Sequence, residues 1–377
     1  MSRYEVDVVV VGGGGMGSAA AWRLAGRGVD VVLLERFEAG HVRGASHGAS
    51  RIFRVSYTEP TYIRLAQEAE GLWRELEAAS GVSLLTTTGG VDHGRTADLG
   101  LLAEAVEAAG APGEWLAPEE AAERWPGLRY DGKVLFHPAG GRLHADDALS
   151  ALQAQAARLG AVVRHETPVT SIVVRGDDAV EVVAGEDVYH AKRVVVAAGA
   201  WAEKLLGGLV PLPPLRVTQE QPAYFAPLRD DVAWPNFVHH LDGESLEAMG
   251  FPSGVYGLGT PGEGVKAGFH GTGPVVDPDD RDFQPEPAQL RALREYARAW
   301  LPGVDADALT PISCTYTTTP TSDFVLDRVG PVVVAAGFSG HGFKFVPAVG
   351  RILADLALTG ERPDARFALN RPPAAAP

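Results

Sequence analysis

Three runs of apolar residues, each meeting a glycine turn, dominate the hydrophobic pattern of this chain. The first run covers residues 6–11, the second residues 193–198 and the third residues 332–337. Uninterrupted β-branched runs of this length are typical of parallel strands that are buried on both faces. The pattern therefore predicts a parallel sheet built from strands that lie far apart in the sequence.

The first run opens a strand, turn, helix and strand in succession, with the helix at residues 18–27 and the second strand ending in Glu35. The turn contains Gly12, Gly14 and Gly17 in the spacing G-x-G-x-x-G. These glycines allow a sharp turn, a close approach of backbone to a pyrophosphate, and tight packing of helix on strand. A carboxylate at the end of the second strand accepts hydrogen bonds from a ribose diol. We interpret the unit as a dinucleotide site; the alternative is a glycine-rich turn in an ordinary βαβ unit.

The remaining pattern predicts helices at residues 62–79, 98–109, 146–159, 287–300 and 349–358, with Asp146 as an N-cap. Strands are expected at residues 84–92 and at several places within 161–196, and an ordered loop at 40–54. From residue 211 to about 313, apolar and polar residues alternate and prolines recur, which indicates an antiparallel sheet in which 287–300 is the only convincing helix.

A chain of 377 residues is long enough for about two domains. We predict an α/β (α+β) fold with a discontinuous Rossmann-like nucleotide-binding domain from residues 1–85, 148–210 and 315–377. A second, antiparallel-sheet domain for the substrate is predicted from residues 86–147 and 211–314. Because the chain crosses between the two several times, we expect the functional cleft at their interface.

Composition excludes several classes of function. The net charge of −15 opposes binding to nucleic acid or to an anionic membrane. No apolar run approaches the roughly 20 residues that a membrane span needs. The first strand begins at about Val6, too early for a signal peptide, and the tail, residues 372–377, carries no lipidation or peroxisomal signal. We therefore expect a cytoplasmic protein.

The numbers and spacing of cysteine and histidine residues limit which disulfides and metal sites the protein can form. Cys314 is the only cysteine, so no internal disulfide can form, and its role is packing, nucleophile, ligand or covalent anchor. The eleven histidines include the adjacent pair His239 and His240 but no H-x-x-x-H spacing and no Cys/His group. We expect no metal site.

Two arginines are candidates for anion binding, and two lysines lie in apolar surroundings. Arg51 and Arg54 share a polar loop with His47, and Lys344 lies between two phenylalanines after a glycine-rich turn. Lys266 occupies a strand-like apolar run. The alternatives are surface arginines and lysines with solvated ammonium groups, and for Cys314 a small buried packing residue.

Six blocks in order resemble the amine-oxidising flavoproteins typified by monomeric sarcosine oxidase and N-methyltryptophan oxidase, within the D-amino-acid-oxidase-like superfamily. They are the glycine turn with Glu35 and the segments SHGASRIFR (46–54), RWPG (124–127), VKAGFH (265–270), SCTYT (313–317) and AAGFSGHGFKF (335–345). The resemblance covers almost the whole chain. It implies an FAD-binding domain joined to an antiparallel substrate domain.

The resemblance implies FAD as the cofactor, attached by a thioether from Cys314 to the flavin 8α-methyl. It places further cofactor contacts at Gly12, Gly14, Gly15, Met16, Gly17, Glu35, Arg36, Ser46, His47, Arg51, Val169, Gly199, Gly340, Gly342, Phe343 and Lys344.

For the reaction, the resemblance implies that Arg54 and Lys344 bind a substrate carboxylate and that Lys266 promotes the reduction of dioxygen. Tyr256 and His270 match positions that line the substrate pocket. The implied activity oxidises a secondary-amine amino acid of the sarcosine or N-methyl type to an imine that hydrolyses. Dioxygen becomes hydrogen peroxide, and the enzyme is expected to be a monomer with small-molecule partners.

The chain departs from these oxidases in the substrate region. They carry two histidines and then Gly-Asp before the arginine loop, whereas this chain has His47 followed by Gly48 and Ala49. The substrate alternatives are therefore a cyclic imino acid or another pathway amine. The functional alternatives are a dehydrogenase of the same fold that uses another electron acceptor, a non-catalytic flavoprotein, and an NAD-dependent enzyme, which would leave Cys314 unexplained.

Overall fold

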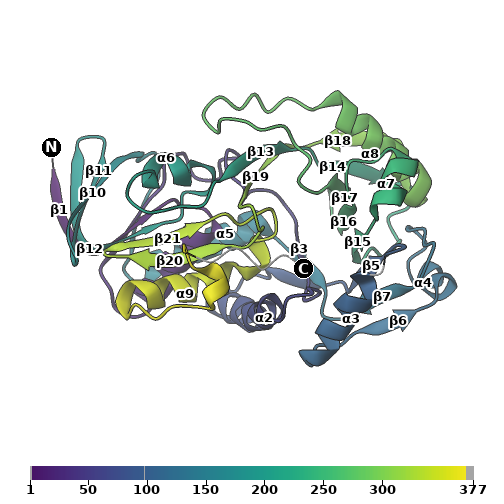
Figure 1. The fold of residues 1–377 in the computed structure, drawn as a ribbon, viewed down its shortest axis with the longest axis horizontal. Coiled ribbons are helices and arrows are strands. Elements are labelled where there is room, and N and C mark those ends of the chain that lie inside the picture. Colours follow the sequence, from purple (N-terminus) through teal and green to yellow (C-terminus); the bar gives the residue numbers. More distant parts are fainter. Residues whose placement is uncertain (1, 97, 371–377) are drawn as a thin grey trace.

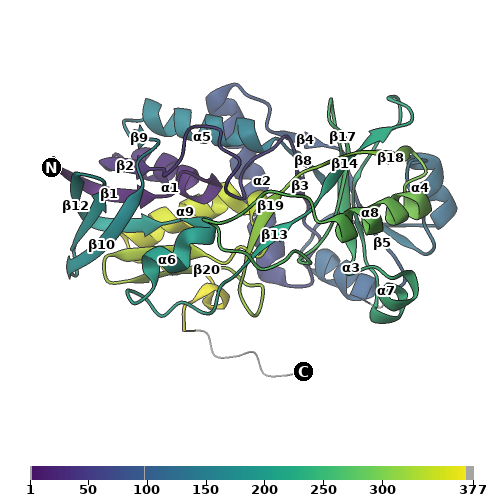
Figure 2. The same cartoon turned by 90° about the horizontal axis from the view of Figure 1, so that it is seen from above.

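The structure is a computed structural model that describes residues 2–96 and 98–370, so the Ala/Pro-rich tail lies outside the described residues. Two eight-stranded sheets form the left and right halves of the molecule in Figure 1. A two-stranded sheet of β13 (Arg216–Glu220) and β19 (Cys314–Thr318) lies between them in both views (Figures 1 and 2).

The left-hand sheet contains the three apolar runs as neighbouring strands. Its strands are β1 (Arg3–Val11), β2 (Val31–Leu34), β9 (Val162–Arg164), β10 (Val169–Gly176), β11 (Ala179–Ala184), β12 (Asp187–Val196), β20 (Val325–Val329) and β21 (Val332–Ala336). Strands β9, β2, β1, β12 and β21 run parallel in that order. The first half of β12 pairs with β11 and its second half with β21. The predicted parallel sheet is confirmed.

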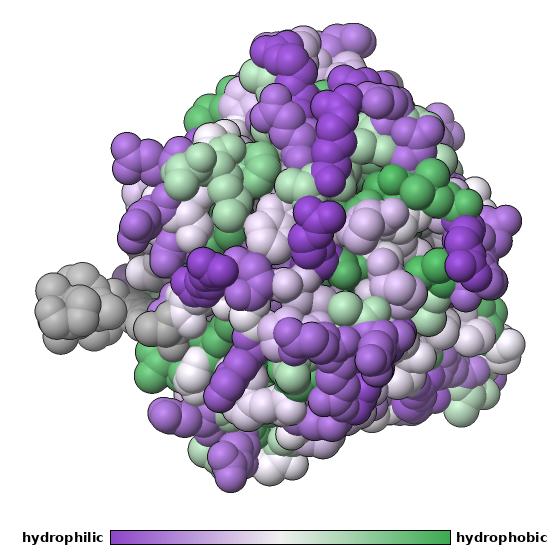
Figure 3. Space-filling model, turned by 90° about the vertical axis from the view of Figure 1, so that its right-hand side faces the viewer, coloured by the Kyte–Doolittle hydropathy of each residue, from purple (hydrophilic) through white to green (hydrophobic). Residues whose placement is uncertain are grey.

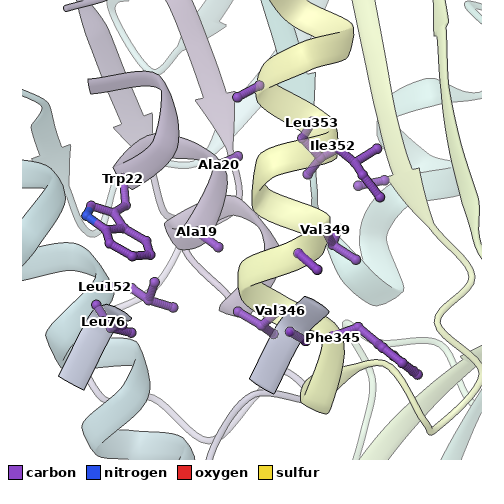
Figure 4. Packing of buried hydrophobic residues seen from close by; sticks show 14 of the residues in the cluster. Ala19, Ala20, Trp22, Leu76, Leu152, Phe345, Val346, Val349, Ile352 and Leu353 are labelled. Carbon is purple, nitrogen blue, oxygen red and sulfur yellow. The ribbon is translucent and has the colours of Figure 1, made fainter. Parts of the chain in front are cut away.

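Both faces of this sheet are buried, which explains the unbroken apolar runs. Val8 and Val10 of β1 face one hydrophobic cluster, and Val9 and Val11 face another. On the first face α1 (Gly15–Ala25) packs against α5 (Ala145–Arg158) and α9 (Val346–Leu358), as Figure 4 shows for Ala19, Ala20 and Val349. The hairpin β10–β11 and α6 (Ala202–Leu206) contribute to the second.

The right-hand sheet has the order β18 (Val304–Pro311), β14 (Ala223–Pro227), β17 (Gly264–Phe269), β16 (Val255–Thr260), β15 (Asn236–His239), β5 (Gly90–His93), β7 (Val134–His137) and β6 (Glu114–Leu116). All neighbours are antiparallel except β15 and β5. Helix α8 (Pro287–Trp300) buries Leu293, Tyr296 and Ala297 in the same core. The predicted α/β fold with an antiparallel second sheet is confirmed; the exact domain boundaries stay a prediction.

The remaining elements are α2 (Pro60–Ser80), α3 (Asp98–Ala108), α4 (Pro118–Arg124), α7 (Gly243–Met249), the three-stranded sheet of β3 (Arg51–Phe53), β8 (Gly141–Leu143) and β4 (Leu85–Thr87), and the 3-10 turns η1 (Gly199–Trp201), η2 (Phe343–Phe345) and η3 (Ala365–Phe367).

Several local predictions were wrong. Asp146 is not an N-cap, because α5 begins at Ala145 and the Asp146 carboxylate instead accepts a hydrogen bond from the Gly48 N–H at 2.7 Å. The expected strand at 84–92 is two strands in different sheets, β4 and β5. The loop at 40–54 contains β3. Helix α7 was missed because it spans only seven residues, of which Leu246 and Met249 are partly buried against the second core.

No helix of residues 2–96 and 98–370 is long and apolar enough to cross a membrane. The face in Figure 3 carries mainly hydrophilic side chains with hydrophobic ones scattered among them.

Candidate active site

A cavity of about 1250 Å³ collects most of the residues that the sequence singled out. The first sheet contributes the segments that follow β1, β2, β12 and β21, and β16, β17 and β19 contribute from the other side. Every predicted site residue lines this cavity except Gly17 and His47. The carboxyl ends of parallel strands and an antiparallel sheet therefore enclose one site, as expected for a ligand at the edge of a doubly wound sheet.

The turn after β1 requires its glycines for steric reasons. Gly12 has φ +103°, and a Cβ there would lie 2.5 Å from the Ala197 carbonyl oxygen at the end of β12. A Cβ on Gly17 would lie 1.9 Å from the Gly12 carbonyl oxygen. Gly17 thus lets α1 pack closely onto the end of β1, although it does not reach the cavity.

The start of α1 is open toward the cavity. Gly14, at the N-cap position, offers no side chain to the helix N-terminus, and Gly14, Gly15 and Met16 line the cavity. The Ser46 hydroxyl accepts a hydrogen bond from the Gly15 N–H at 3.0 Å. The unpaired N–H groups and the positive end of the helix dipole suit a phosphate.

Glu35 is held as a carboxylate at the same end of the sheet. Its oxygens accept hydrogen bonds from the N–H groups of Gly13, at 2.6 Å, and Phe37, at 2.9 Å. Burial raises the pKa of Glu35, but hydrogen bonds from His41 and from these two N–H groups outweigh burial and lower it. The charged carboxylate, the glycine turn and the remaining free N–H groups at the start of α1 together fit the dinucleotide part of FAD.

Other predicted cofactor contacts have structural roles that the sequence did not indicate. A Cβ on Gly340 would lie 2.2 Å from the Tyr316 ring, and one on Gly342 would lie 2.7 Å from the Phe338 side chain. Arg36 is exposed and pairs with Asp279 at 2.6 Å. These residues border the cavity, but packing and an ion pair already account for them.

Lys266 and Arg51 both line the cavity. Lys266, in β17, is 5% exposed, and its Nζ donates to the Ser50 carbonyl oxygen at 3.3 Å. Burial, and secondly the charge of Arg51, lower the pKa of Lys266 to about 7. Arg51 donates to the carbonyl oxygens of Ser50 and Ala45 and forms no ion pair with a carboxylate of the described chain.

Arg54 and Lys344 come together on Tyr57. The Arg54 guanidinium carbon lies 4.6 Å from the centre of the Tyr57 ring, and the Lys344 Nζ donates to the Tyr57 hydroxyl at 2.8 Å. Arg54 Nη1 donates to the Ser56 oxygens, whereas its Nε and Nη2 have no hydrogen-bond partner among residues 2–96 and 98–370. Burial, followed by the charge of Arg54, holds the pKa of Lys344 well below its usual range.

Two histidines near these cations have lowered pKa values. Burial, and then the charges of Arg54 and Lys344, lower the pKa of His270 to about 4. His270 and Tyr256 line the cavity, and the His270 ring lies 5.1 Å from that of Tyr316. His47 lies behind the cavity wall, where burial and the charge of Arg51 lower its pKa to about 3.

Cys314, the first residue of β19, lines the cavity and is partly exposed. Lys266 and the buried Arg281 both interact electrostatically with its sulfur. Arg281 is fixed by hydrogen bonds to Gln219, Ser313 and the Arg43 carbonyl oxygen. The sulfur therefore lies in an electropositive part of the site.

Sequence reasoning missed Tyr57, Arg281, Asp92 and the place of His240 in the cavity wall. A carboxylate inside the buried strand β5 was the one available signal for Asp92, because a buried charge needs partners. No group of three or more His, Cys, Asp or Glu in the described ranges is arranged to hold a metal ion.

The fold and the cavity define a dinucleotide-binding protein whose second sheet closes over the nucleotide end of the first. The family described as FAD dependent oxidoreductase matches residues 7–356. The chain is 35% identical to monomeric sarcosine oxidase from Bacillus sp. (strain NS-129), over 97% of this chain and 96% of that protein. It is 29% identical to N-methyl-L-tryptophan oxidase of Yersinia pestis (strain Pestoides F), over 93% and 94%.

Among solved structures, the chain is similar to the open form of NikD, described as an unusual amino acid oxidase essential for nikkomycin biosynthesis. The TM-score is 0.85 at 29% identity, covering 97% of this chain and 98% of the other. The chain belongs to the FAD-dependent oxidoreductases, in the family of monomeric sarcosine oxidase and N-methyltryptophan oxidase. It is an FAD-dependent oxidoreductase acting on amine donors.

Proposed function

We propose that this enzyme oxidises the C–N bond of a secondary-amine amino acid, of the sarcosine or N-methyl type, and that dioxygen is reduced to hydrogen peroxide. The observation that carries the proposal is the convergence of Arg54 and Lys344 on Tyr57 at the cavity wall. The names of the relatives, monomeric sarcosine oxidase and N-methyl-L-tryptophan oxidase, support the substrate class.

Arg54 and Lys344 provide the carboxylate site in this proposal. The Nε and Nη2 atoms of Arg54 form one edge of the guanidinium, and an edge of this kind binds a carboxylate through two parallel hydrogen bonds. Lys344 Nζ donates to Tyr57 and to the His341 carbonyl oxygen, and a substrate carboxylate beside it would favour the protonated form, whose third N–H then points to the substrate. A charge-assisted contact of this type contributes about 1.5–3 kcal/mol.

The amine end of the substrate lies in this proposal near Tyr256 and His270. Because the pKa of His270 is lowered to about 4, its imidazole is neutral at neutral pH. A neutral, partly apolar wall favours the unprotonated amine, whose lone pair is available for oxidation. No side chain then needs to act as a strong base.

FAD, held by the glycine turn after β1, the start of α1 and Glu35, would supply the redox chemistry: a two-electron oxidation at the carbon next to nitrogen, with dioxygen as the final electron acceptor. Lys266 would then be the fixed cation that stabilises the negative charge developing on dioxygen. Its burial makes that charge effective, because water screens it poorly. The same residue argues against a dehydrogenase that uses another acceptor.

We further propose that Cys314 carries the flavin covalently through a thioether to the 8α-methyl. The sulfur borders the cavity and lies near Lys266 and Arg281. A covalent link would prevent loss of the cofactor. We also propose that the protein acts as a monomer, with the small amine substrate and dioxygen as its partners.

A substrate panel under anaerobic conditions tests the activity. Sarcosine, larger N-methyl amino acids, proline and pipecolate are each mixed with the holoenzyme, and bleaching of the flavin spectrum is followed. We expect N-methyl amino acids to bleach it, and readmitted air to restore the colour with one hydrogen peroxide per turnover. Bleaching restored only by an artificial acceptor would favour the dehydrogenase, and bleaching by cyclic imino acids alone would change the substrate class.

A further inference from the structure

His240 lines the cavity next to Arg54, and the activity proposed above does not use it. It follows β15, whose parallel pairing with β5 places Val238 opposite Asp92. The His240 N–H donates to the His93 carbonyl oxygen at 2.8 Å, so the pairing continues to His240 itself. The backbone of His240 is thus fixed by the sheet.

Asp92 fixes the side chain of His240. Asp92 is 2% exposed, and its two oxygens accept hydrogen bonds from His240 Nε2, at 2.7 Å, and His137 Nε2, at 2.9 Å. The oxygen bonded to His240 also lies 3.8 Å from Arg54 Nη1. Burial raises the pKa of Asp92, but the hydrogen bonds from His137 and His240 and the charge of Arg54 hold it well below its usual range.

These contacts leave one nitrogen of His240 unused. An ionised carboxylate only accepts hydrogen bonds, so the contact with Asp92 places a proton on Nε2. In the neutral ring Nδ1 is then an acceptor, and it has no hydrogen-bond partner among the described residues. The side chain is 28% exposed and borders the cavity. The ring that carries this acceptor is oriented by the same Asp92 oxygen that lies 3.8 Å from Arg54 Nη1.

We propose that Nδ1 of His240 is a substrate contact and that the site selects carboxylates carrying a hydrogen-bond donor, such as a hydroxyl or an N–H, a short distance from the carboxylate. The shared Asp92 oxygen sets that distance, because it joins His240 to Arg54. The inference rests on the proposed function only in taking Arg54 and Lys344 as the carboxylate site. It makes His240 a specificity residue and Asp92 its positioning residue.

Unreactive acids test this subsite without turnover. We would titrate the holoenzyme, by calorimetry, with ω-hydroxy acids of three to six carbons and with the alkanoates of the same length. One chain length should place the hydroxyl on Nδ1, and there the hydroxy acid should bind roughly three- to tenfold more tightly than its alkanoate. The wild-type comparison alone already tests the proposal.

Three variants assign the preference to His240. H240F keeps a flat ring without nitrogen, and H240A serves if H240F does not fold; both should bind the two series equally while still binding the alkanoates. T96A removes a hydroxyl from the same cavity wall and should keep the wild-type preference.

Equal binding of both series by the wild type would overturn the subsite, as would a hydroxyl preference that survives in H240F and H240A. If neither series binds, the carboxylate site itself is wrong, and the subsite fails with it. Failure of the carboxylate site can be distinguished from failure of the subsite, because the two outcomes that overturn the subsite leave binding of the alkanoates intact.

Discussion

Burial decides how the two lysines of the cavity act. Lys266 and Lys344 are each 5% exposed, and neither forms an ion pair with a carboxylate of the described residues. Both donate hydrogen bonds to neutral oxygens instead. Lys266 donates to the Ser50 carbonyl oxygen, and Lys344 donates to the Tyr57 hydroxyl and the His341 carbonyl oxygen. When protonated, each lysine can therefore offer its positive charge to an anion in the cavity, which is the property that the proposed activity uses.

Replacing Lys266 with Met should separate the two halves of the reaction. The rate constant for reoxidation of the reduced enzyme by dioxygen should fall about 100-fold or more, because one fixed charge is lost. Reduction by the substrate should change less than about tenfold. Stopped-flow measurement of each half-reaction checks this, with K192M as a control, since Lys192 is exposed and pairs with Asp7. Equal slowing of both halves would contradict the role.

The wild-type enzyme should show a matching pH dependence. Because the pKa of Lys266 is lowered to about 7, its ammonium is charged below that pH and neutral above it. Reoxidation by dioxygen should therefore slow as the pH rises through about 7, and K266M should lose this dependence. A pH-independent rate in the wild type would argue against the assignment.

The single cysteine allows a direct test of the covalent link. Wild-type protein precipitated with acid should keep its yellow colour in the pellet, whereas C314S should release free flavin into the supernatant. Absorbance spectra of the two fractions measure the difference. Colour that stays in the C314S pellet would place the attachment at another residue.

At the scale of elements, the start of α1 depends on the close approach of the helix to β1. In G17A the new methyl group would lie 1.9 Å from the Gly12 carbonyl oxygen, so the helix or the turn must move. We expect a loss of about 1–3 kcal/mol or more in the free energy of unfolding and a lower flavin content. Urea unfolding and the flavin-to-protein absorbance ratio are the measurements.

Gly71 provides the control. It lies inside α2, and a Cβ there would meet nothing within 4 Å. G71A should therefore raise the free energy of unfolding by about 0.5–1 kcal/mol through helix propensity alone. A similar gain in G17A would show that the tight contact with Gly12 does not limit stability.

The length of a helix or strand decided whether it could be predicted from the sequence. Long periodic segments such as α2 and α8 could be predicted from their apolar stripes, and β12 and β21 from their unbroken runs. The short helix α7 and the division of residues 84–92 into β4 and β5 could not be predicted, since a seven-residue helix and strands of three and four residues carry too little periodicity.

On the scale of the whole molecule, buried neutral histidines link stability to pH. Burial lowers the pKa of His47, His239 and His341 to about 3, and holds that of His93 well below its usual range. In the unfolded chain a histidine titrates near pH 6.5. Between these values the unfolded state binds more protons, so the free energy of unfolding must fall as the pH is lowered from about 6.5 toward 3.

Urea unfolding at pH 8, 7, 6 and 5 measures this effect. We expect little change from pH 8 to 7 and a progressive loss below about 6.5. H341N should make the decline shallower, because one buried imidazole is removed. H190N should not, since His190 is partly exposed beside Glu181. Constant stability from pH 7 to 5 would contradict the burial of these rings as neutral groups.

The candidate site could be predicted in part. The glycine turn and Glu35 are contiguous patterns, and Lys266, Arg54, Lys344 and Cys314 came from the resemblance to sarcosine oxidases. The proposed roles of these residues remain to be tested. Tyr57, Arg281 and the Asp92–His240 pair could not be predicted, because each acts through a partner far away in the sequence.

By itself the sequence determined the parallel sheet, the glycine-rich turn that follows the first strand, and the carboxylate of Glu35 that follows the second strand. Apolar periodicity and the steric freedom of glycine are local properties, readable from consecutive residues. Only the tertiary structure decided that Arg54 and Lys344 meet on Tyr57, that Lys266 is buried, and that Asp92 orients His240. Burial and charge pairing depend on which distant segments pack together, and no short pattern encodes that packing.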